Sequence, residues 1–258
     1  RNESGTPQGG LISPLLANMA LDGMERMFKE HFPRKKVHLI RFADDFLVTA
    51  DSQETALQCK ELITEFLHER GLELSEEKTK IVHINEGFDF LGWNFRKFKG
   101  KFLIQPSKKA IAAIIDKVRV IIKSAKTWKQ EDLIKALNPV IKGWAMYHRT
   151  VSASMTFGKL DWVVRNMLWR WAKRRHNNKG KRWIARKYWH PTLTRKQVFR
   201  TSTLTLENFS NTKIQYRKFI KLDANPFIDT EYFEHRPGVF LSKQRSIRMF
   251  LHCAHKSG

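Results

Sequence analysis

Charge is distributed unevenly along the chain, and this asymmetry strongly constrains how the chain can be organised. Residues 1–100 carry 14 Lys and Arg against 16 Asp and Glu, whereas residues 101–258 carry 34 basic and 9 acidic residues. A near-neutral part followed by a part of net charge +25 predicts two functional regions, with a boundary near residues 97–105. Hydrophobic residues make up 41% of the 258 positions, too many for a disordered polycation, so each part is expected to bury a core.

The net charge of +23 predicts a polyanionic partner. Because self-repulsion at such a charge costs stability, nucleic acid is favoured over an anionic membrane surface or a merely soluble basic surface. No apolar run approaches the ~20 residues of a membrane span, and the sequence does not begin with a secretory signal. Cys59 and Cys253 are the only cysteines, which excludes a disulfide framework and favours a reducing cytosol.

The first hundred residues have the pattern of an α+β fold with an antiparallel sheet. Ser13-Pro14 is typical of a helix start. Stretches 37–42 and 46–50 are rich in β-branched and aromatic residues, and they predict a β-hairpin with two acids at or near its turn. Asp51 begins a possible capping box for a helix that stops at Gly71. Further strands are expected at 80–84 and 88–95.

The second part is expected to be mostly helical. Ser107 can cap a helix whose isoleucines recur at helical spacing from 111 to 122. A helix over 133–147 contains Pro139, which predicts a start or a kink there. A Trp- and Arg-rich helix follows at 160–175, and helical periodicity fades beyond His190.

Asp44 and Asp45 are adjacent carboxylates at the predicted hairpin turn. Their mutual repulsion would be relieved by a divalent cation, and Mg²⁺ prefers one or two carboxylates together with water and substrate phosphates. Two such ions can assist nucleotidyl transfer by activating an attacking oxygen and stabilising the leaving group. The alternative is an ordinary Asp-Asp turn, in which the side chains only bond the local backbone.

A glycine-rich segment precedes these acids. Gly5–Gly10 contains three glycines that permit close backbone approach to a ligand, together with Gln8, which can donate and accept hydrogen bonds. The helix predicted to follow could favour an anion at its amide end. The segment is neither a Walker A loop nor a dinucleotide fingerprint, so an ordinary loop that enters a helix is the alternative.

These motifs, in this order, resemble the group II intron reverse transcriptase/maturase family. The resemblance extends to about Pro237 and rests on several segments: Gly5–Gly10 with residues 11–18, Phe42–Asp45, Gly71–Lys80, Phe88–Trp93, Leu137–Pro139, Gly143–His148, Trp169–Trp189 and Asp223–Phe227. It implies the C-terminal part of a polymerase palm at 1–100, a helical thumb/maturase domain at 101–190 and a basic, DNA-binding-like tail at 191–258.

The resemblance also implies an activity and its partners. The expected activity is RNA-directed DNA polymerisation by two-metal nucleotidyl transfer with Mg²⁺, combined with maturase binding of intron RNA for splicing and retrohoming. The implied partners are group II intron RNA, an RNA template with a DNA primer, target DNA and deoxynucleoside triphosphates, with no membrane. The expected location is the bacterial cytosol or nucleoid, with an organelle as the alternative.

Specific residues match the family's palm motifs. Asp44 and Asp45 correspond to catalytic, metal-binding acids. The primer grip corresponds to Gly92 and Trp93, for which a buried strand is the alternative. Contact with nucleotide or template is implied for a further set: Gln8, Gly9, Phe42, Ala43 and Lys78. Phe42 replaces the more usual Tyr, and Lys78 could equally be a solvated side chain.

Residues 159–189 hold 11 Lys and Arg against one acid, with aromatic residues interleaved. Cations contact phosphates, and exposed aromatic rings stack on unpaired bases. We expect Trp162 and Trp169, seven residues apart, to be core. The alternative is that the tryptophans form core while the cations only solvate one face. The family resemblance implies that the bound polyanion is intron RNA, and the candidate RNA-binding cations are Arg165, Arg170, Lys173, Arg174, Arg175, Lys179, Lys181, Arg182, Arg186 and Lys187.

The sequence departs from the family in two places. The further metal-binding Asp of an earlier strand and the fingers region have no match, so the metal site is expected to be incomplete, the chain to be a C-terminal portion and polymerisation by it alone to be weak or absent. His252–His255 contains no Cys-x-x-Cys pair, so we expect no HNH endonuclease; a zinc site there is the less favoured alternative to a basic tail. Two other functions are a non-catalytic RNA-binding splicing factor and a general DNA-binding module.

Overall fold

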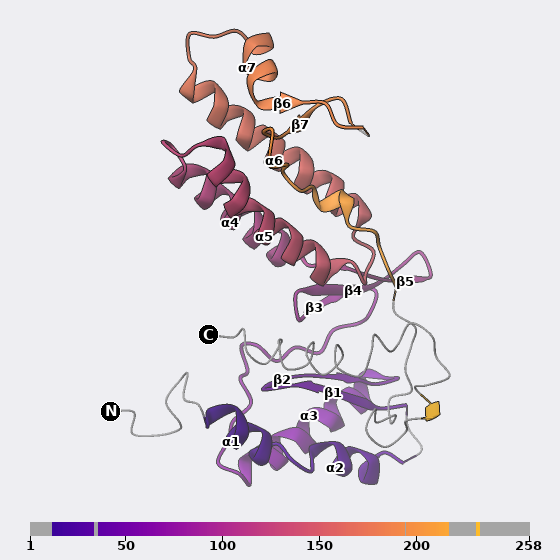
Figure 1. The fold of residues 1–258 in the computed structure, drawn as a ribbon. Helices are drawn as coiled ribbons and strands as arrows, with labels where there is room; N and C mark the ends of the chain where they lie inside the picture. Colours follow the sequence, from indigo (N-terminus) through magenta and orange to yellow (C-terminus); the bar gives the residue numbers. More distant parts are fainter. Residues whose placement is uncertain (1–11, 34–35, 194, 217–230, 233–258) are drawn as a thin grey trace. The chain divides into compact units, whose positions relative to one another are not determined.

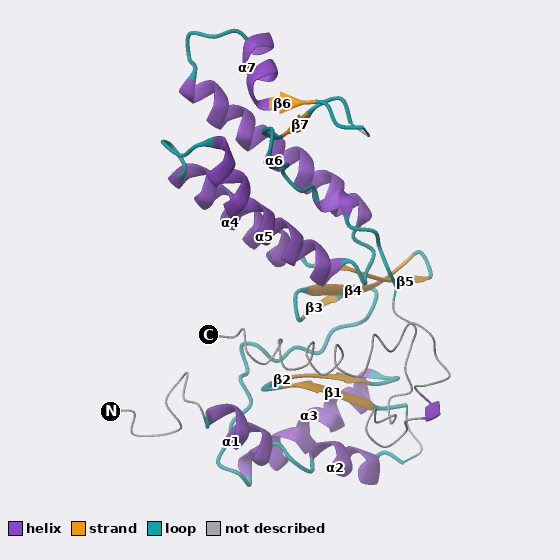
Figure 2. Cartoon of the chain, in the orientation of Figure 1, coloured by secondary structure: helices purple, strands orange, loops and turns teal. Residues whose placement is uncertain are grey.

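A computed structural model describes residues 12–33, 36–193, 195–216 and 231–232 (Figure 1). The chain forms two compact units that divide between His83 and Ile84, ahead of the stretch at which its charge changes. The described residues combine helices with small antiparallel sheets, which confirms the α+β class (Figure 2). Over these ranges, no helix combines the length and the apolar character that crossing a bilayer requires.

In the first unit, a two-stranded hairpin lies against helices. Strand β1 (His38–Phe42) pairs with β2 (Asp45–Thr49), as the sequence predicted. The helices are α1 (Ser13–Ala20), α2 (Met24–His31) and α3 (Gln53–His68). Side chains of α2 and α3 form the core, and alternate hairpin residues such as Leu39 and Val48 pack on it because successive strand residues point to opposite faces.

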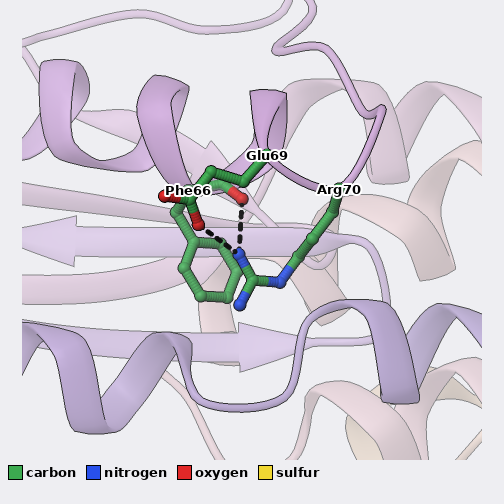
Figure 3. Close-up of polar contacts among 3 residues, drawn as sticks. All are labelled: Phe66, Glu69 and Arg70. Atoms are coloured by element: carbon green, nitrogen blue, oxygen red, sulfur yellow. Dashed lines mark hydrogen bonds and ion pairs between the residues drawn. The ribbon is translucent and has the colours of Figure 1, made fainter.

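The end of α3 confirms the predicted stop at Gly71. Gly71 has a φ of +66°, and the amide of Leu72 donates to the carbonyl of Leu67, which together form a Schellman cap. Arg70 strengthens the end, because its guanidinium donates to the Phe66 carbonyl at 2.8 Å and lies 3.5 Å from the centre of the Phe66 ring (Figure 3). It also pairs with Glu69.

Two helix starts differ from the expectation by one residue. The N-cap of α3 is Ser52, not Asp51, because the Ser52 hydroxyl oxygen accepts the amide of Thr55. Ser13 is the first helical residue of α1 rather than its cap, which is Ile12.

The second unit begins with a three-stranded antiparallel sheet of β3 (Phe88–Phe90), β4 (Trp93–Phe98) and β5 (Lys101–Pro106). The expected single strand over 88–95 is therefore wrong: a turn at Leu91-Gly92 divides it. Both turn residues have positive φ, +49° and +78°, which is the type I′ geometry that matches strand twist. The expected strand at 80–84 is also wrong, since these residues form no strand; the Ile84 carbonyl accepts the Lys97 amide of β4.

Four helices follow: α4 (Lys108–Ser124), α5 (Gln130–His148), α6 (Ser154–Arg175) and α7 (Lys181–Tyr188). Helices α4, α5 and α6 run alongside one another (Figure 1). Ser107 caps α4 as expected, and the isoleucine stripe faces the core. Helix α5 begins well before Pro139 and continues through it, so the expected start at this proline is wrong.

The core of this unit extends past residue 190 into a returning segment, residues 189–216. It contains β6 (Trp189–His190), β7 (Val198–Phe199) and the short 3₁₀ helix η1 (Phe209–Asn211). Phe199 and Phe209 are buried in the helical core. The assignment of residues 191–258 to DNA binding stays a prediction, and its motifs at 223–227 and 252–255 lie outside the described residues.

Three polar side chains of the helices hold the backbone of the returning segment. The Gln130 amide donates to the carbonyls of Tyr188 and Arg200. Asn138 donates to the Thr205 carbonyl and accepts the Glu207 amide. The carboxylate of Asp161 accepts the amides of Phe209 at 2.7 Å and Ser210 at 3.2 Å, so it caps η1 from another element.

Trp162 is not core, contrary to the expectation, because 66% of its surface is exposed. Trp162 and Trp169 do share one side of α6, but the returning segment covers this side at one end only. There Trp169 packs against Trp189, with ring centres 5.1 Å apart. The buried stripe of α6 runs through Leu160, Val164 and Leu168 instead.

We predict that Asp161→Ala lowers the free energy of unfolding of the second unit by about 1–3 kcal/mol, because two backbone amides lose a charged acceptor. Asp161→Asn keeps one acceptor oxygen and should cost less. Denaturant unfolding followed by tryptophan fluorescence measures this, since all eight tryptophans belong to the second unit. Asp116→Ala, which removes an exposed carboxylate from α4, is the control; equal losses in both Ala variants would contradict the capping role.

Candidate functional site

The acidic pair lies at the tip of the β1–β2 hairpin. Phe42 and Asp45 close the hairpin as partners, and Ala43-Asp44 form its two-residue turn. Both carboxylates are exposed. Ala43 has a φ of +53°, a conformation that costs a non-glycine residue about 1 kcal/mol or more and is often held in place at functional sites.

Arg41 braces this turn, a role that the sequence analysis did not assign. One guanidinium nitrogen donates to the side-chain oxygen of Asn18 at 2.9 Å and to the carbonyl of Ala43 at 3.2 Å. The first bond joins the hairpin to α1, and the second fixes the strained turn residue that precedes Asp44. A cation three positions before an acid in a hairpin is the only sequence signal for this role.

The face of the hairpin that carries Asp45 also carries exposed apolar side chains. Partners across an antiparallel pair point to the same side, so Phe42 lies beside Asp45, and Ile40 continues that side. Phe42 is 52% exposed and Ile40 is 40% exposed. An exposed aromatic ring beside two carboxylates can contact the flat surface of a nucleotide while the acids face its phosphates.

The donor set suits Mg²⁺ but does not complete a site for it. Asp44 and Asp45 supply hard oxygens, and Mg²⁺ accepts one or two carboxylates when water and phosphates fill the other positions. Within the described residues, no group of three or more His, Cys, Asp or Glu is placed to hold a metal ion. Any further ligand must come from outside this set.

The other residues expected near a nucleotide are placed only in part. Lys78 is exposed in a turn after α3, and it makes no hydrogen bond or ion pair with any described residue. Gln8 and Gly9 lie outside the described residues. The roles of all these residues in binding nucleotide or template stay predictions.

The expected primer-grip residues belong to the second unit, where the Leu91-Gly92 turn is fixed onto α5. The Tyr147 hydroxyl donates to the Leu91 carbonyl at 2.7 Å. The Ser107 amide donates to the Gly92 carbonyl at 2.9 Å. With a φ of +78°, Gly92 is constrained by its backbone conformation rather than by lack of space, since the nearest atoms to an added Cβ are 3.9 Å away.

Trp93 is anchored by aromatic residues of α5. Its ring stacks on Tyr147 with centres 5.1 Å apart, and its indole nitrogen donates to Nδ1 of His148 at 3.0 Å. His148 is only 2% exposed, and burial lowers its pKa to about 4. An accepting Nδ1 requires the neutral imidazole, so the hydrogen bond and the low pKa agree.

This histidine predicts acid sensitivity of the second unit. The unfolded chain binds a proton at His148 near pH 6.5, whereas the folded chain does so only near pH 4. The contribution to stability is therefore complete above pH 6.5 and is lost as the pH falls towards 4. Between pH 7 and pH 5, the free energy of unfolding should fall by about 1–2 kcal/mol from this group.

Tryptophan fluorescence in denaturant at each pH measures the effect, and His148→Gln, which keeps an acceptor for Trp93, should remove most of it. The control His190→Gln changes a half-buried histidine of the same unit and should leave the pH dependence as it was. An unchanged slope in His148→Gln would show that another group is responsible.

The cations expected to bind RNA are exposed on α6, α7 and the loop between them. Two of them also make internal contacts. Arg165 donates to the Gln197 side chain, and Arg175 donates to the carbonyls of Lys126 and Trp128, which ties the end of α6 to the α4–α5 loop. Within the described ranges, none of the ten pairs with a carboxylate at ion-pair distance.

Two family models match the chain, one in each of its two parts. The reverse transcriptase (RNA-dependent DNA polymerase) model matches residues 1–95, which include the acidic turn and Gly92-Trp93. The group II intron, maturase-specific domain model matches residues 111–189, which include all of α7. The chain is therefore similar to group II intron reverse transcriptase/maturase proteins in both of its parts.

Curated relatives agree with this assignment. Maturase-like protein 1 of Euglena gracilis is 28% identical over 158 residues, which cover 57% of this chain and 32% of the relative. Group II intron-encoded protein LtrA of Lactococcus lactis is 27% identical over 154 residues, covering 36% of this chain and 26% of LtrA. Protein YkfC of Escherichia coli is 26% identical over 132 residues, covering 38% of this chain and 34% of YkfC. The chain thus spans about a quarter to a third of the length of these relatives.

Proposed function

We propose that this reverse transcriptase/maturase chain contributes metal-binding acids to RNA-directed DNA polymerisation and binds intron RNA for splicing and retrohoming. The observation that carries the first activity is the exposed Asp44–Asp45 pair on a strained turn that Arg41 braces. Strained backbone is concentrated at functional sites, and a bound cation would relieve the repulsion between the adjacent carboxylates. Deoxynucleoside triphosphates and a primed RNA template are the proposed substrates.

Asp44 and Asp45 would hold Mg²⁺, which supplies positive charge to the phosphates that react and lowers the pKa of the attacking hydroxyl group. The chain's own part is to present the two carboxylates at a fixed turn. Phe42 supports the nucleotide beside them, and Gly92-Trp93 positions the primer. The third metal-binding Asp of the family has no match among these 258 residues, so polymerisation must be measured in the native protein that carries this sequence.

In that protein, we predict that Asp44→Ala lowers Mg²⁺-dependent primer extension by at least about 100-fold, because a metal ligand is lost. The matched control is Asp51→Ala, which removes an exposed acid a few residues further along the chain, after β2, and should keep activity near that of the unmodified protein. Intron RNA binding by Asp44→Ala should be unchanged. Unimpaired extension in Asp44→Ala would reject the metal-binding role and favour the second candidate, a non-catalytic RNA-binding splicing factor.

The maturase role is supported by the exposed Lys and Arg side chains of α6 and α7, which form no ion pair with a carboxylate among the described residues. They lie within the part of the chain that the maturase-specific model matches. We expect this surface to bind phosphates of structured intron RNA, with release of counterions. Target DNA is a further proposed partner, for retrohoming. The proposed location is the cytosol or nucleoid. A general DNA-binding module, the remaining alternative, would not distinguish intron RNA from duplex DNA.

We predict that the triple variant Arg170→Gln, Lys173→Gln and Arg174→Gln weakens binding of group II intron RNA at least tenfold. It should also reduce the slope of log affinity against log salt by about 0.7 per lost contact. The control variant Lys109→Gln, Lys117→Gln and Lys123→Gln removes the same charge from exposed positions of α4.

Filter binding against random duplex DNA at matched salt completes the design. Intron RNA should bind more tightly than the DNA, and the α4 variant should keep most of that preference. Equal losses in both triple variants, with equal binding of RNA and DNA, would show a nonspecific polycation and overturn the maturase assignment.

A further inference from the structure

The bend between α6 and α7 gathers cations around one imidazole. We call Arg175, His176, Lys179, Trp183 and Lys187 the α6–α7 corner. Burial lowers the pKa of His176 below its usual value, and the positive charges of Lys187, Arg175 and Lys179 lower it further. Three positive charges around one ring repel each other, and their arrangement is stabilised when an anion binds among them.

Trp183 holds two of these cations in place. The ammonium of Lys187 lies 5.0 Å from the centre of the indole ring, and that of Lys179 lies 5.7 Å from it. His176 meets the same ring edge-on, with centres 4.8 Å apart. The indole therefore orders flexible lysine side chains before any ligand arrives, which reduces the entropy lost on binding.

Among the described residues, no acidic side chain neutralises the positive charge of the α6–α7 corner. Arg175 is largely engaged within the protein: it donates to the carbonyls of Lys126 and Trp128, hydrogen-bonds the Tyr188 side chain and lies 4.6 Å from the centre of the Trp171 ring. The donors offered to a phosphate are therefore the exposed ammonium groups of Lys179 and Lys187. His176 is bound through Nε2 to the Tyr188 hydroxyl at 2.8 Å. No carboxylate among the described residues pairs with Arg175, Lys179 or Lys187.

We propose that the α6–α7 corner is a phosphate site for an unpaired RNA nucleotide, in which Lys179 and Lys187 bind the phosphodiester and Trp183 contacts the base. Trp183 is 40% exposed, so its ring can be reached from solvent. The site adjoins the exposed Lys and Arg residues of α6. Because a nucleic acid backbone can contact both groups of cations, it is favoured over a free phosphate ion as the ligand. This inference rests on the proposed binding of intron RNA and adds to it a defined subsite.

Occupation of the site should be linked to protonation of His176. A bound phosphodiester offsets the three cations, so the pKa of His176 rises in the complex. The complex then holds more protons than the free chain, and binding tightens as the pH falls from 7.5 to 5.5. The other charged or titratable groups that act on His176 are Arg175, Lys179, Lys187 and the Tyr188 hydroxyl.

The test is a histidine NMR titration of the full chain with and without a 12-nucleotide oligouridylate, with the His176 signal identified by its loss in His176→Gln. The pKa of His176 should rise by about one unit on binding, equivalent to a tenfold tighter complex at the protonated limit. A methylphosphonate oligomer, which lacks the backbone charge, should leave it unchanged. Lys187→Gln should abolish the rise, whereas Lys123→Gln on α4 should preserve it.

The outcomes separate the subsite from the broader function. RNA that binds with its usual affinity while the His176 pKa stays constant, and with Lys187→Gln equal to Lys123→Gln, overturns the subsite and leaves intron RNA binding in place. Failure of the chain to bind oligouridylate or intron RNA at any pH overturns both. A rise that the uncharged oligomer also produces overturns the phosphate contact.

Discussion

The hydrogen bond from the half-buried Trp93 indole to the buried His148 is the contact on which the organisation of the second unit depends. It joins a strand of the reverse transcriptase match to a helix of the maturase-specific match, together with the stacked ring of Tyr147. Because the bond needs a neutral histidine in a site closed to water, it also requires the surrounding helices to be packed. The turn expected to grip a primer is thus built on the same core as the helices expected to bind RNA.

The acidic turn is held by a different balance of forces. Its hairpin has two strands, and among the described residues one face, which includes Leu39 and Val48, is packed on a core. The strained Ala43 and the exposed acids would favour a looser tip, and the two hydrogen bonds of Arg41 oppose this. A catalytic turn needs a fixed geometry and access from solvent. Arg41 fixes the backbone at Ala43 from the side, so the carboxylates of Asp44 and Asp45 stay exposed.

Local patterns predicted the elements whose causes lie close in sequence, such as the β1–β2 hairpin, the end of α3 at Gly71 and the cap of α4 at Ser107. The local pattern alone missed the Leu91-Gly92 turn because alternating aromatic residues continue on both sides of it, although the family resemblance implied a turn at Gly92-Trp93. The clamps made by Gln130, Asn138 and Asp161 were missed for another reason. Their partners are backbone groups tens of residues away. Because nearly every residue carries the same backbone groups, the sequence does not show which ones a side chain will bind.

The exposure of Trp162 shows why the candidate RNA surface could be located but not resolved from sequence. Helical spacing establishes that Trp162 and Trp169 share a side of α6, but whether that side is covered depends on where the returning segment crosses it. The cations pose the same problem. The sequence does not distinguish the role of Arg175 from that of its neighbour Arg174. In the structure, Arg175 donates hydrogen bonds to two carbonyls of the α4–α5 loop. Charge patterning therefore identifies a polyanion-binding surface, while the packing decides which cations order the protein and which are available to a phosphate.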